Sequence, residues 1–336
     1  MGQYTSCHSI EQGLVFNGVN LLTFCSLARP PEDGGGEPVY RSDYNGEKID
    51  WEDFFEYRNH LRKIIKENGS IPECKDCMFL REQNWGGEKK LSYILLTNWI
   101  ECNSDCIYCP MPDPKRNKKY NIVPIIKDII KNNIMSEDGT IEYAGGEPTM
   151  YKYFDESLNL LINNNFKRIV INTNAIKFSP KILKGIKNGL IEMVVSMDAG
   201  TQEIHEKVKR VKSFQKIWDN LSKYASVQDK NSKNKLRTKF IIVPGLNDDK
   251  NEISLWLEKT KSININSVAL NVDLNWIFNN SNNIEGMKKI LALTDFFIQK
   301  SNELELEWII YPNIKDIVVR YNASPQVELY SPVFSL

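Results

Sequence analysis

The stretch ECNSDCIYCP, from Glu101 to Pro110, decides the fold of this chain. It carries Cys102, Cys106 and Cys109 in a C-x-x-x-C-x-x-C spacing. Three thiols on one short loop cannot all pair with one another, but they can bind one compact metal cofactor. A tetrahedral zinc site would need a fourth Cys or His nearby, and the next histidine is only His205. A four-iron, four-sulfur cluster held by three cysteines keeps one iron open to a non-protein ligand.

The overall composition limits the class of protein. The chain has 336 residues, 41% of them hydrophobic, which is enough for a large buried core. Its 43 basic and 43 acidic residues balance, so the net charge predicts no binding to nucleic acid or to anionic membranes. No apolar run is long enough to span a bilayer, and the start MGQYTSCHSI is no secretory signal. We expect a cytoplasmic protein, and the odd count of seven cysteines argues against a disulfide framework.

The segments around the cysteine loop read as a strand–helix–strand unit. The apolar run LSYILLTNWI, Leu91 to Ile100, predicts a strand directly before the loop. The helix-like IVPIIKDIIKNNI and the strand-like TIEYA follow, and then comes AGGEPT, Ala144 to Thr149. Two similar runs exist elsewhere. GGGEP at 34–38 lies in a Pro/Gly-rich segment and is predicted to be a loop, and GGEK at 86–89 is predicted to be a linker without chemistry.

The alternation of strand-like and helix-length segments continues along the chain. RIVINTN, LIEMVVSMD, RTKFIIVPG and SVALNVDL add four predicted strands, which makes six between Leu91 and Leu274. This rhythm predicts parallel βα units. The tail predicts a helix over MKKILALTDFFIQKS, a strand over LELEWIIYP and a further short helix.

These features together resemble the radical S-adenosylmethionine (radical SAM) superfamily. The resemblance implies an α/β fold, a partial (β/α)6 TIM-like barrel over residues 90–275, with residues 276–336 as an extension that packs on it. It also implies that the three loop cysteines bind a 4Fe-4S cluster whose open iron is chelated by S-adenosylmethionine. In the family, reduction of the cofactor yields a 5′-deoxyadenosyl radical that abstracts hydrogen from a substrate.

The resemblance further implies cofactor-binding roles for Tyr108, Gly145, Gly146, Glu147, Asn174, Ser196 and Asp198. The aromatic ring would lie beside the adenine, and the Gly-Gly-Glu motif would receive the ammonium group, since glycines admit a ligand close to the backbone and a carboxylate pairs with a cation. The remaining three follow the third and fourth strands, near the ribose and carboxylate. His205 replaces a frequent family Tyr and is predicted to be an exposed helix histidine. Arg210 and Lys239 are interpreted either as ligands of the cofactor's carboxylate or as solvated charges.

Four further cysteines precede the barrel, at Cys7, Cys25, Cys74 and Cys77. With the strand-like GLVF and VNLLTF runs and the closing C-K-D-C, residues 1–89 resemble a SPASM-type or twitch-type auxiliary domain, placed at the N-terminus instead of the usual C-terminus. The resemblance implies a second 4Fe-4S cluster. A structural zinc site with four cysteine ligands and a set of buried unligated thiols are the alternatives.

The function predicted from these features is that of a radical SAM oxidoreductase. It would oxidise (dehydrogenate) or epimerise a small molecule such as a sugar or a nucleotide-linked sugar, with a reducing partner such as flavodoxin or ferredoxin. Assigning all seven cysteines to clusters leaves no thiol hydrogen donor, which favours dehydrogenation. The alternatives are modification of a ribosomally made peptide and a non-enzymatic iron-sulfur or zinc protein.

Overall fold

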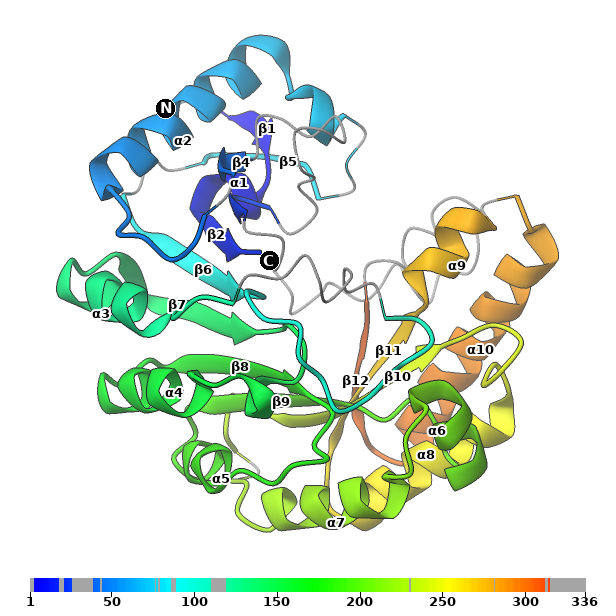
Figure 1. Cartoon of the computed structure of the whole chain (residues 1–336). Helices are drawn as coiled ribbons and strands as arrows, with labels where there is room; N and C mark the ends of the chain where they lie inside the picture. Colours follow the sequence, from blue (N-terminus) through cyan, green and yellow to red (C-terminus); the bar gives the residue numbers. More distant parts are fainter. Residues whose placement is uncertain are drawn as a thin grey trace. The chain divides into compact units, whose positions relative to one another are not determined.

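The structure is a computed structural model with two compact units (Figure 1). The first comprises the described residues of Met1–Glu101 and Met111–Ile171, and the second those of Cys102–Pro110 and Asn172–Phe334. The structure describes residues 3–17, 21–25, 39–42, 44–75, 77, 79–85, 89–109, 119–229, 231–280, 282–311 and 314.

A mixed sheet forms the centre of the first unit. Its strands, in spatial order, are β4 (Val39–Arg41), β3 (Leu22–Thr23), β2 (Gly13–Phe16), β6 (Leu91–Leu96), β7 (Met135–Tyr143) and β8 (Arg168–Thr173). The pairs β6–β7 and β7–β8 are parallel, and β2 also pairs in parallel with β6, with Gly13 opposite Tyr93. The N-terminal segment and the first barrel strands therefore share one sheet.

Helices complete the first unit. They are α1 (His8–Gln12), α2 (Trp51–Asn68), α3 (Val123–Lys131) and α4 (Phe154–Asn163), with 3-10 turns η2 (Pro72–Cys74) and η4 (Pro148–Met150). A separate ribbon pairs β1 (Tyr4–Ser6) with β5 (Arg81–Gln83). The long helix α2 is capped by Asp50, whose carboxylate accepts hydrogen bonds from the amides of Glu52 and Asp53, and by Gly69 in the left-handed region.

The second unit repeats the βα alternation. Its parallel strands lie in the order β9 (Ile191–Ser196), β10 (Leu236–Ile242), β11 (Ser267–Val272) and β12 (Glu307–Ile310). The helices are α5 (Pro180–Lys187), α6 (Gln202–Lys209), α7 (Phe214–Ala225), α8 (Lys250–Ser262), α9 (Leu274–Asn279) and α10 (Ile284–Glu303). Strands β9 to β11 are buried along most of their length, as strands covered on both faces must be.

The predicted α/β fold is confirmed. Each of the six predicted barrel strands is present, as β6 to β11, and the predicted tail strand forms β12. The parallel pairing of β2 with β6 was not expected from sequence, because the short run GLVF has no pattern that reveals its partner. The loop prediction for 34–38, most of the linker prediction for 86–89 and the last predicted helix lie outside the described residues.

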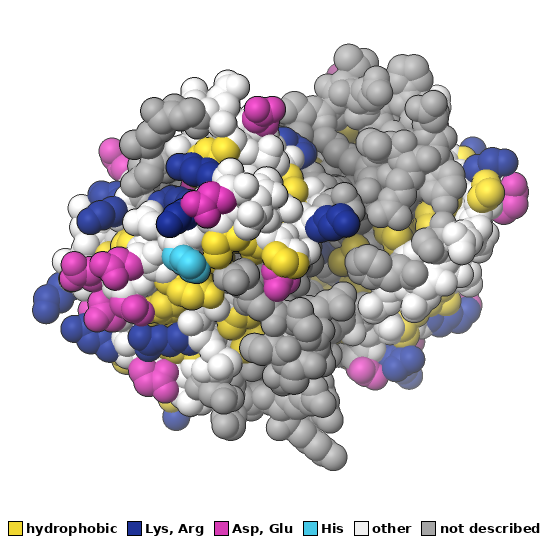
Figure 2. Space-filling model, turned by 90° about the horizontal axis from the view of Figure 1, so that it is seen from above, with side chains coloured by type: hydrophobic (Ala, Val, Ile, Leu, Met, Phe, Trp, Pro, Cys, Tyr) yellow, Lys and Arg dark blue, Asp and Glu magenta, His cyan; other side chains and the backbone are white. Residues whose placement is uncertain are grey.

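The surface carries charges of both signs. On the face shown in Figure 2, Lys and Arg side chains are interspersed with Asp and Glu in the described parts, in keeping with 43 basic and 43 acidic residues in the whole chain. None of the helices in the part of the chain that the structure describes combines the length and the apolar character that crossing a membrane requires.

Candidate active site

The cysteine loop is part of the second unit and is anchored to the end of α6. The amide of Asp105 donates to the carbonyl of Lys209 at 3.1 Å, and the amide of Ile107 donates to the carbonyl of Val208 at 3.1 Å. These two bonds satisfy carbonyls that would otherwise lack partners at the helix C-terminus. Of the three cysteines, Cys102 and Cys109 are exposed and Cys106 is half-buried. The thiols therefore lie on a loop whose backbone has fixed partners.

Asn174, one of the predicted cofactor-binding residues, holds the start of this loop. It directly follows β8, and its side-chain nitrogen donates to Asn103 Oδ1 at 2.6 Å. The same nitrogen lies 3.3 Å from Ser104 Oγ and 3.6 Å from Cys102 Sγ. Its oxygen accepts the amide of Ile176 at 3.0 Å, which fixes the amide orientation. The structure thus brings Asn174 and the first cysteine together.

Tyr108 and Asp198 are also brought together, by a lysine that the sequence did not single out. The Tyr108 hydroxyl donates to Asp198 Oδ2 and accepts from Lys209 Nζ at 2.6 Å, and Lys209 also pairs with Asp198 Oδ2. The side chains of Lys209 and Asp198 are 2% and 0% exposed, so this ion pair is fully removed from water. Lys209 was missed because it lies in the charge run EKVKR, although its spacing from His205 and Val208 places all three on one buried helix face.

A further layer of hydrogen bonds fixes Asp198. Its second carboxylate oxygen accepts the amide of Ile241 at 2.7 Å, and its carbonyl accepts from Asn247 Nδ2 at 2.9 Å. Asn247 in turn bonds the carbonyl of Ile241 at 2.8 Å and the amide of Val243 at 2.6 Å. Asp198 has φ +57°, in the left-handed region that Asp tolerates better than most residues. The carboxylate thus has a protein donor on each oxygen.

Two opposing effects act on the pKa of the Cys106 thiol. Burial raises the pKa of the Cys106 thiol, and the positive charge of Lys209 opposes that rise. Because the thiolate is the form that binds metal, Lys209 supports cluster binding at this position. Burial, followed by the charge of Asp198, raises the pKa of Tyr108 well above its usual value, so its hydroxyl keeps its proton and stays a donor.

The Gly-Gly-Glu motif is built into the first unit by close backbone contacts. A Cβ on Gly145 would lie 2.5 Å from the carbonyl oxygen of Trp99, and one on Gly146 would lie 2.2 Å from that of Glu101. The amide of Glu147 donates to the same Glu101 carbonyl at 2.7 Å. Only glycine fits at these two positions, because any side chain would displace the segment that leads into the cysteine loop.

Glu147 is buried and caps η4. It is 1% exposed, and its Oε1 accepts the Thr149 amide at 3.1 Å and the Thr149 hydroxyl at 2.7 Å. Its predicted contact with the cofactor ammonium stays a prediction. Ser196 is the last residue of β9 and lies opposite Lys239 of β10 in the parallel register, and its predicted role near the cofactor likewise stays a prediction.

The prediction that His205 is exposed is wrong. Its exposed fraction is 0%, its Nε2 lies 3.2 Å from Ser213 Oγ and its Nδ1 lies 3.4 Å from the carbonyl oxygen of Met197. Burial, followed by the nearby charge of Lys209, lowers its pKa below the usual 6.5. A single histidine in a polar helix segment reads as exposed, but here the buried face of α6 includes it.

The four N-terminal cysteines come together in the first unit. Cys7 precedes α1, Cys25 follows β3, Cys74 ends η2, and the amide of Cys77 donates to the carbonyl of Cys74 at 3.1 Å. Burial raises the pKa of Cys7 to about 11 and of Cys74 to about 12, and the charges of the neighbouring cysteines add to both shifts. The charges of the other three cysteines all affect the pKa of Cys74, so the four thiols lie near one another.

The four thiols at this place are of the residue type that binds metal clusters. A bound cation would favour the thiolate forms of Cys7 and Cys74, whose pKa values are raised in its absence. At their positions in this structure, no three His, Cys, Asp or Glu side chains of the described residues form a group that could hold a metal ion. The match with a cluster therefore rests on residue type and proximity, here and at the loop cysteines.

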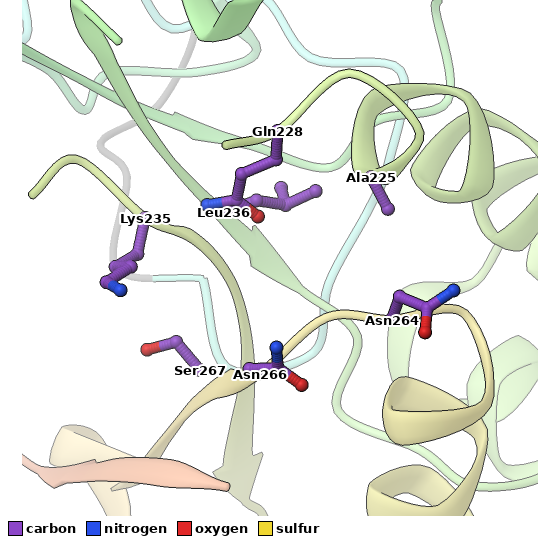
Figure 3. Close-up of a pocket in the computed structure, with 7 residues that line it drawn as sticks. All are labelled: Ala225, Gln228, Lys235, Leu236, Asn264, Asn266 and Ser267. Carbon is purple, nitrogen blue, oxygen red and sulfur yellow. The ribbon is translucent and has the colours of Figure 1, made fainter. Parts of the chain in front are cut away.

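One pocket lies away from these residues. Lys235 and Leu236 at the start of β10, with Asn266 and Ser267 at the start of β11, line it (Figure 3). In barrels of parallel strands, active sites lie at the carboxyl ends of the strands. This pocket is at the opposite ends of β10 and β11, and we assign it no role in the chemistry.

A central segment of the chain matches a known family model. Residues 100–257 match the model of the Radical SAM superfamily. This segment contains the three loop cysteines and the Gly-Gly-Glu motif. Over this segment the chain is therefore similar to the radical SAM superfamily.

Individual relatives are distant. The GTP 3′,8-cyclase of Clostridium botulinum is 24% identical over 186 residues, which cover 54% of this chain and 57% of the cyclase. A UPF0026 protein of Helicobacter pylori is 24% identical over 193 residues, which cover 54% of this chain and 61% of that protein. The chain thus spans little more than half the length of these curated relatives.

Among solved structures, Streptococcus suis SuiB bound to precursor peptide SuiA superposes with a TM-score of 0.51 and 14% identity. The match covers 79% of this chain and 66% of the SuiB chain. At this identity the likeness shows a shared fold, not a shared substrate.

Proposed function

We propose that this chain is a radical SAM enzyme in which Cys102, Cys106 and Cys109 hold a 4Fe-4S cluster that S-adenosylmethionine completes. The observation that carries the proposal is the cysteine loop of the superfamily segment, whose backbone and side chains are bonded to Lys209, Val208 and Asn174. When bound, the cluster and its cofactor supply the reductive cleavage that starts hydrogen abstraction.

The chain's own residues would orient the cofactor. The Gly145–Gly146 backbone approaches Trp99 and Glu101 too closely for a side chain, so this turn would offer a ligand its main-chain atoms. Glu147 brings a carboxylate to the same turn, where it would favour the ammonium group of the cofactor. Tyr108, held as a proton donor by Asp198, would present its ring beside the adenine.

The N-terminal thiols support a second cluster. Cys7, Cys25, Cys74 and Cys77 provide a complete set of protein ligands, which suits electron transfer more than direct binding of a substrate. A centre of this kind would take up the electron that a substrate radical loses when it becomes a double bond, with the proton released to a base or to water. This supports dehydrogenation as the reaction type.

We propose a sugar or a nucleotide-linked sugar as the substrate. A curated relative carries the name GTP 3′,8-cyclase, so a nucleotide-containing compound is the first class to offer. With seven cysteines assigned to two clusters, no thiol is left to return a hydrogen atom, which favours oxidation over epimerisation. A reduced flavodoxin or ferredoxin is the expected source of the electron for the loop cluster.

The first experiment measures iron, sulfide and zinc per chain after anaerobic reconstitution. The wild type is compared with a variant that lacks Cys102, Cys106 and Cys109, and with a matched variant that lacks the four N-terminal cysteines. We expect about eight irons in the wild type and about four in each variant. Wild-type protein that takes up zinc but no iron would overturn the proposed enzyme class.

The second experiment tests the substrate. Reconstituted protein is reduced with dithionite in the presence of S-adenosylmethionine, and 5′-deoxyadenosine is quantified with sugars, nucleotide-linked sugars or peptides added. We expect a nucleotide-linked sugar to raise the rate and to lose two mass units. A rate raised only by a peptide would replace the sugar proposal with peptide modification and would leave the class intact.

A further inference from the structure

The strongest unexplained feature of the second unit is the buried ion pair between Asp198 and Lys209. Taking two charges out of water is costly unless both are well paired and hydrogen-bonded. Here the pair is 0% and 2% exposed, and each partner also bonds the Tyr108 hydroxyl. Tyr108 lies between Cys106 and Cys109, so the ion pair is hydrogen-bonded to the cysteine loop.

We propose that Lys209 and Asp198 are positioning residues that hold the cysteine loop in its binding shape, and that the Lys209 ammonium offsets part of the loop's negative charge. This rests on the proposed function for the identity of what the loop binds. The contacts that hold the loop do not depend on the proposed function, because each of them joins two groups of this chain.

The loop has three successive anchors. Asn174 bonds its start at Asn103. The amides of Asp105 and Ile107 bond the last carbonyls of α6 in its middle. The ion pair bonds its end at Tyr108. Since Lys209 provides both a backbone carbonyl for the middle anchor and a side chain for the last one, it connects two of the three.

The charges around the cysteine loop also support a role for Lys209. Bound thiolates carry negative charge, and the C-terminal end of a helix such as α6 adds a partial negative charge of its own. Lys209 is the buried cation at that helix end, and it interacts electrostatically with Cys106 and Cys102. Arg210, the next residue, is 57% exposed and lies 3.3 Å from Asp105, so water screens its charge.

The backbone next to Asp198 is fixed as well. Asn247 bonds the carbonyl of Asp198 and the carbonyl of Ile241, and the Ile241 amide bonds the carboxylate. Strand β10 is thus connected through Asp198 to Tyr108. These groups leave Asp198 few alternative positions. A displacement of the ion pair would therefore also displace the cysteine loop.

The test compares Lys209→Met with Lys209→Arg and with Lys207→Met. Lys207 is on the same helix, two residues earlier, and is 52% exposed. Hydrogen exchange is measured on metal-free protein over the segment 102–109. We expect Lys209→Met to exchange this segment about tenfold faster, Lys209→Arg to restore much of the protection, and Lys207→Met to match the wild type.

The second readout is the reconstituted cluster. Loss of the buried positive charge should lower the reduction potential of the loop cluster in Lys209→Met, because a nearby cation stabilises the more negative reduced state. The electron paramagnetic resonance signal of the reduced cluster should shift in the same variant. Lys209→Arg should stay close to the wild type in both.

Two further variants keep the test decisive if Lys209→Met does not fold. Tyr108→Phe removes only the hydroxyl, and Asp198→Asn combined with Lys209→Met removes both charges together. A folded Lys209→Met, or either substitute, with unchanged exchange at 102–109 and an unchanged potential would overturn the proposal. Protein that binds no iron would defeat the proposed function, and the exchange of the metal-free loop would still decide the positioning role.

Discussion

The two groups of cysteines are built in opposite ways. Cys102, Cys106 and Cys109 are neighbours in sequence on a largely exposed loop, held by partners such as Lys209 that come from elsewhere in the second unit. Cys7, Cys25 and the Cys74/Cys77 pair come from three separate segments of the first unit, and Cys7 and Cys74 are buried. A local motif needs an external scaffold, whereas a dispersed set of ligands depends on the fold that assembles it.

The largest expected effect separates these two groups by activity. Cys106→Ser should reduce cleavage of S-adenosylmethionine to background, because the loop has no fourth cysteine to replace it. The measurement is 5′-deoxyadenosine formed under dithionite. Cys106→Ser protein that still cleaves the cofactor at the wild-type rate would contradict the assignment of the loop.

A second, smaller effect is expected at the other group. Cys74→Ser should keep cofactor cleavage within about tenfold of the wild type, because the loop cluster retains its ligands, while the iron content falls toward about four per chain. Iron analysis and cofactor cleavage are measured on the same preparation. Equal loss of cleavage in Cys74→Ser and Cys106→Ser would show that the two groups do not act independently.

Much of the cysteine loop and of the strands around it could be predicted from sequence. The loop cysteines, the Gly-Gly-Glu turn and the six strands follow from spacing and periodicity, which are local properties. The pairing of β2 with β6 and the burial of Lys209 could not be predicted, because they depend on contacts between distant segments. A lysine in EKVKR has the same local pattern whether it faces water or Asp198.

A third prediction concerns stability at the Gly-Gly-Glu turn. Gly146→Ala should destabilise the metal-free protein by about 2–3 kcal/mol, because the new methyl group meets backbone atoms of Ile100 and Glu101 that cannot move freely. The control is Gly69→Ala at the end of α2, where nothing lies within 4 Å but φ is +80°. That change should cost about 1–2 kcal/mol. Urea denaturation measures both, and a smaller loss at Gly146 would show that the turn adapts.

The smallest expected effect is on the pH dependence near α6. Burial, followed by the charge of Lys209, lowers the pKa of His205, so the folded protein prefers the neutral ring. The stability that His205 contributes is therefore complete above pH 6.5 and is lost as the pH falls through its lowered folded value.

His205→Gln should flatten this acid loss, because glutamine does not take up a proton in this pH range. The measurement is urea denaturation between pH 7 and pH 5, with an exposed-site control, His60→Gln on α2. An acid loss that is the same in the wild type and in His205→Gln would show that other groups cause it.

The parallel pairing of β2 with β6 has a consequence for how the chain folds during synthesis. Residues Gly13–Phe16 leave the ribosome long before their partners at Tyr93–Leu96, so β2 must wait with an unpaired edge. Such a distant pairing slows folding, because a long loop has to close before its contacts contribute. An N-terminal truncation that removes β2 would leave the corresponding edge of β6 open, and the shortened protein should aggregate more readily than the full chain.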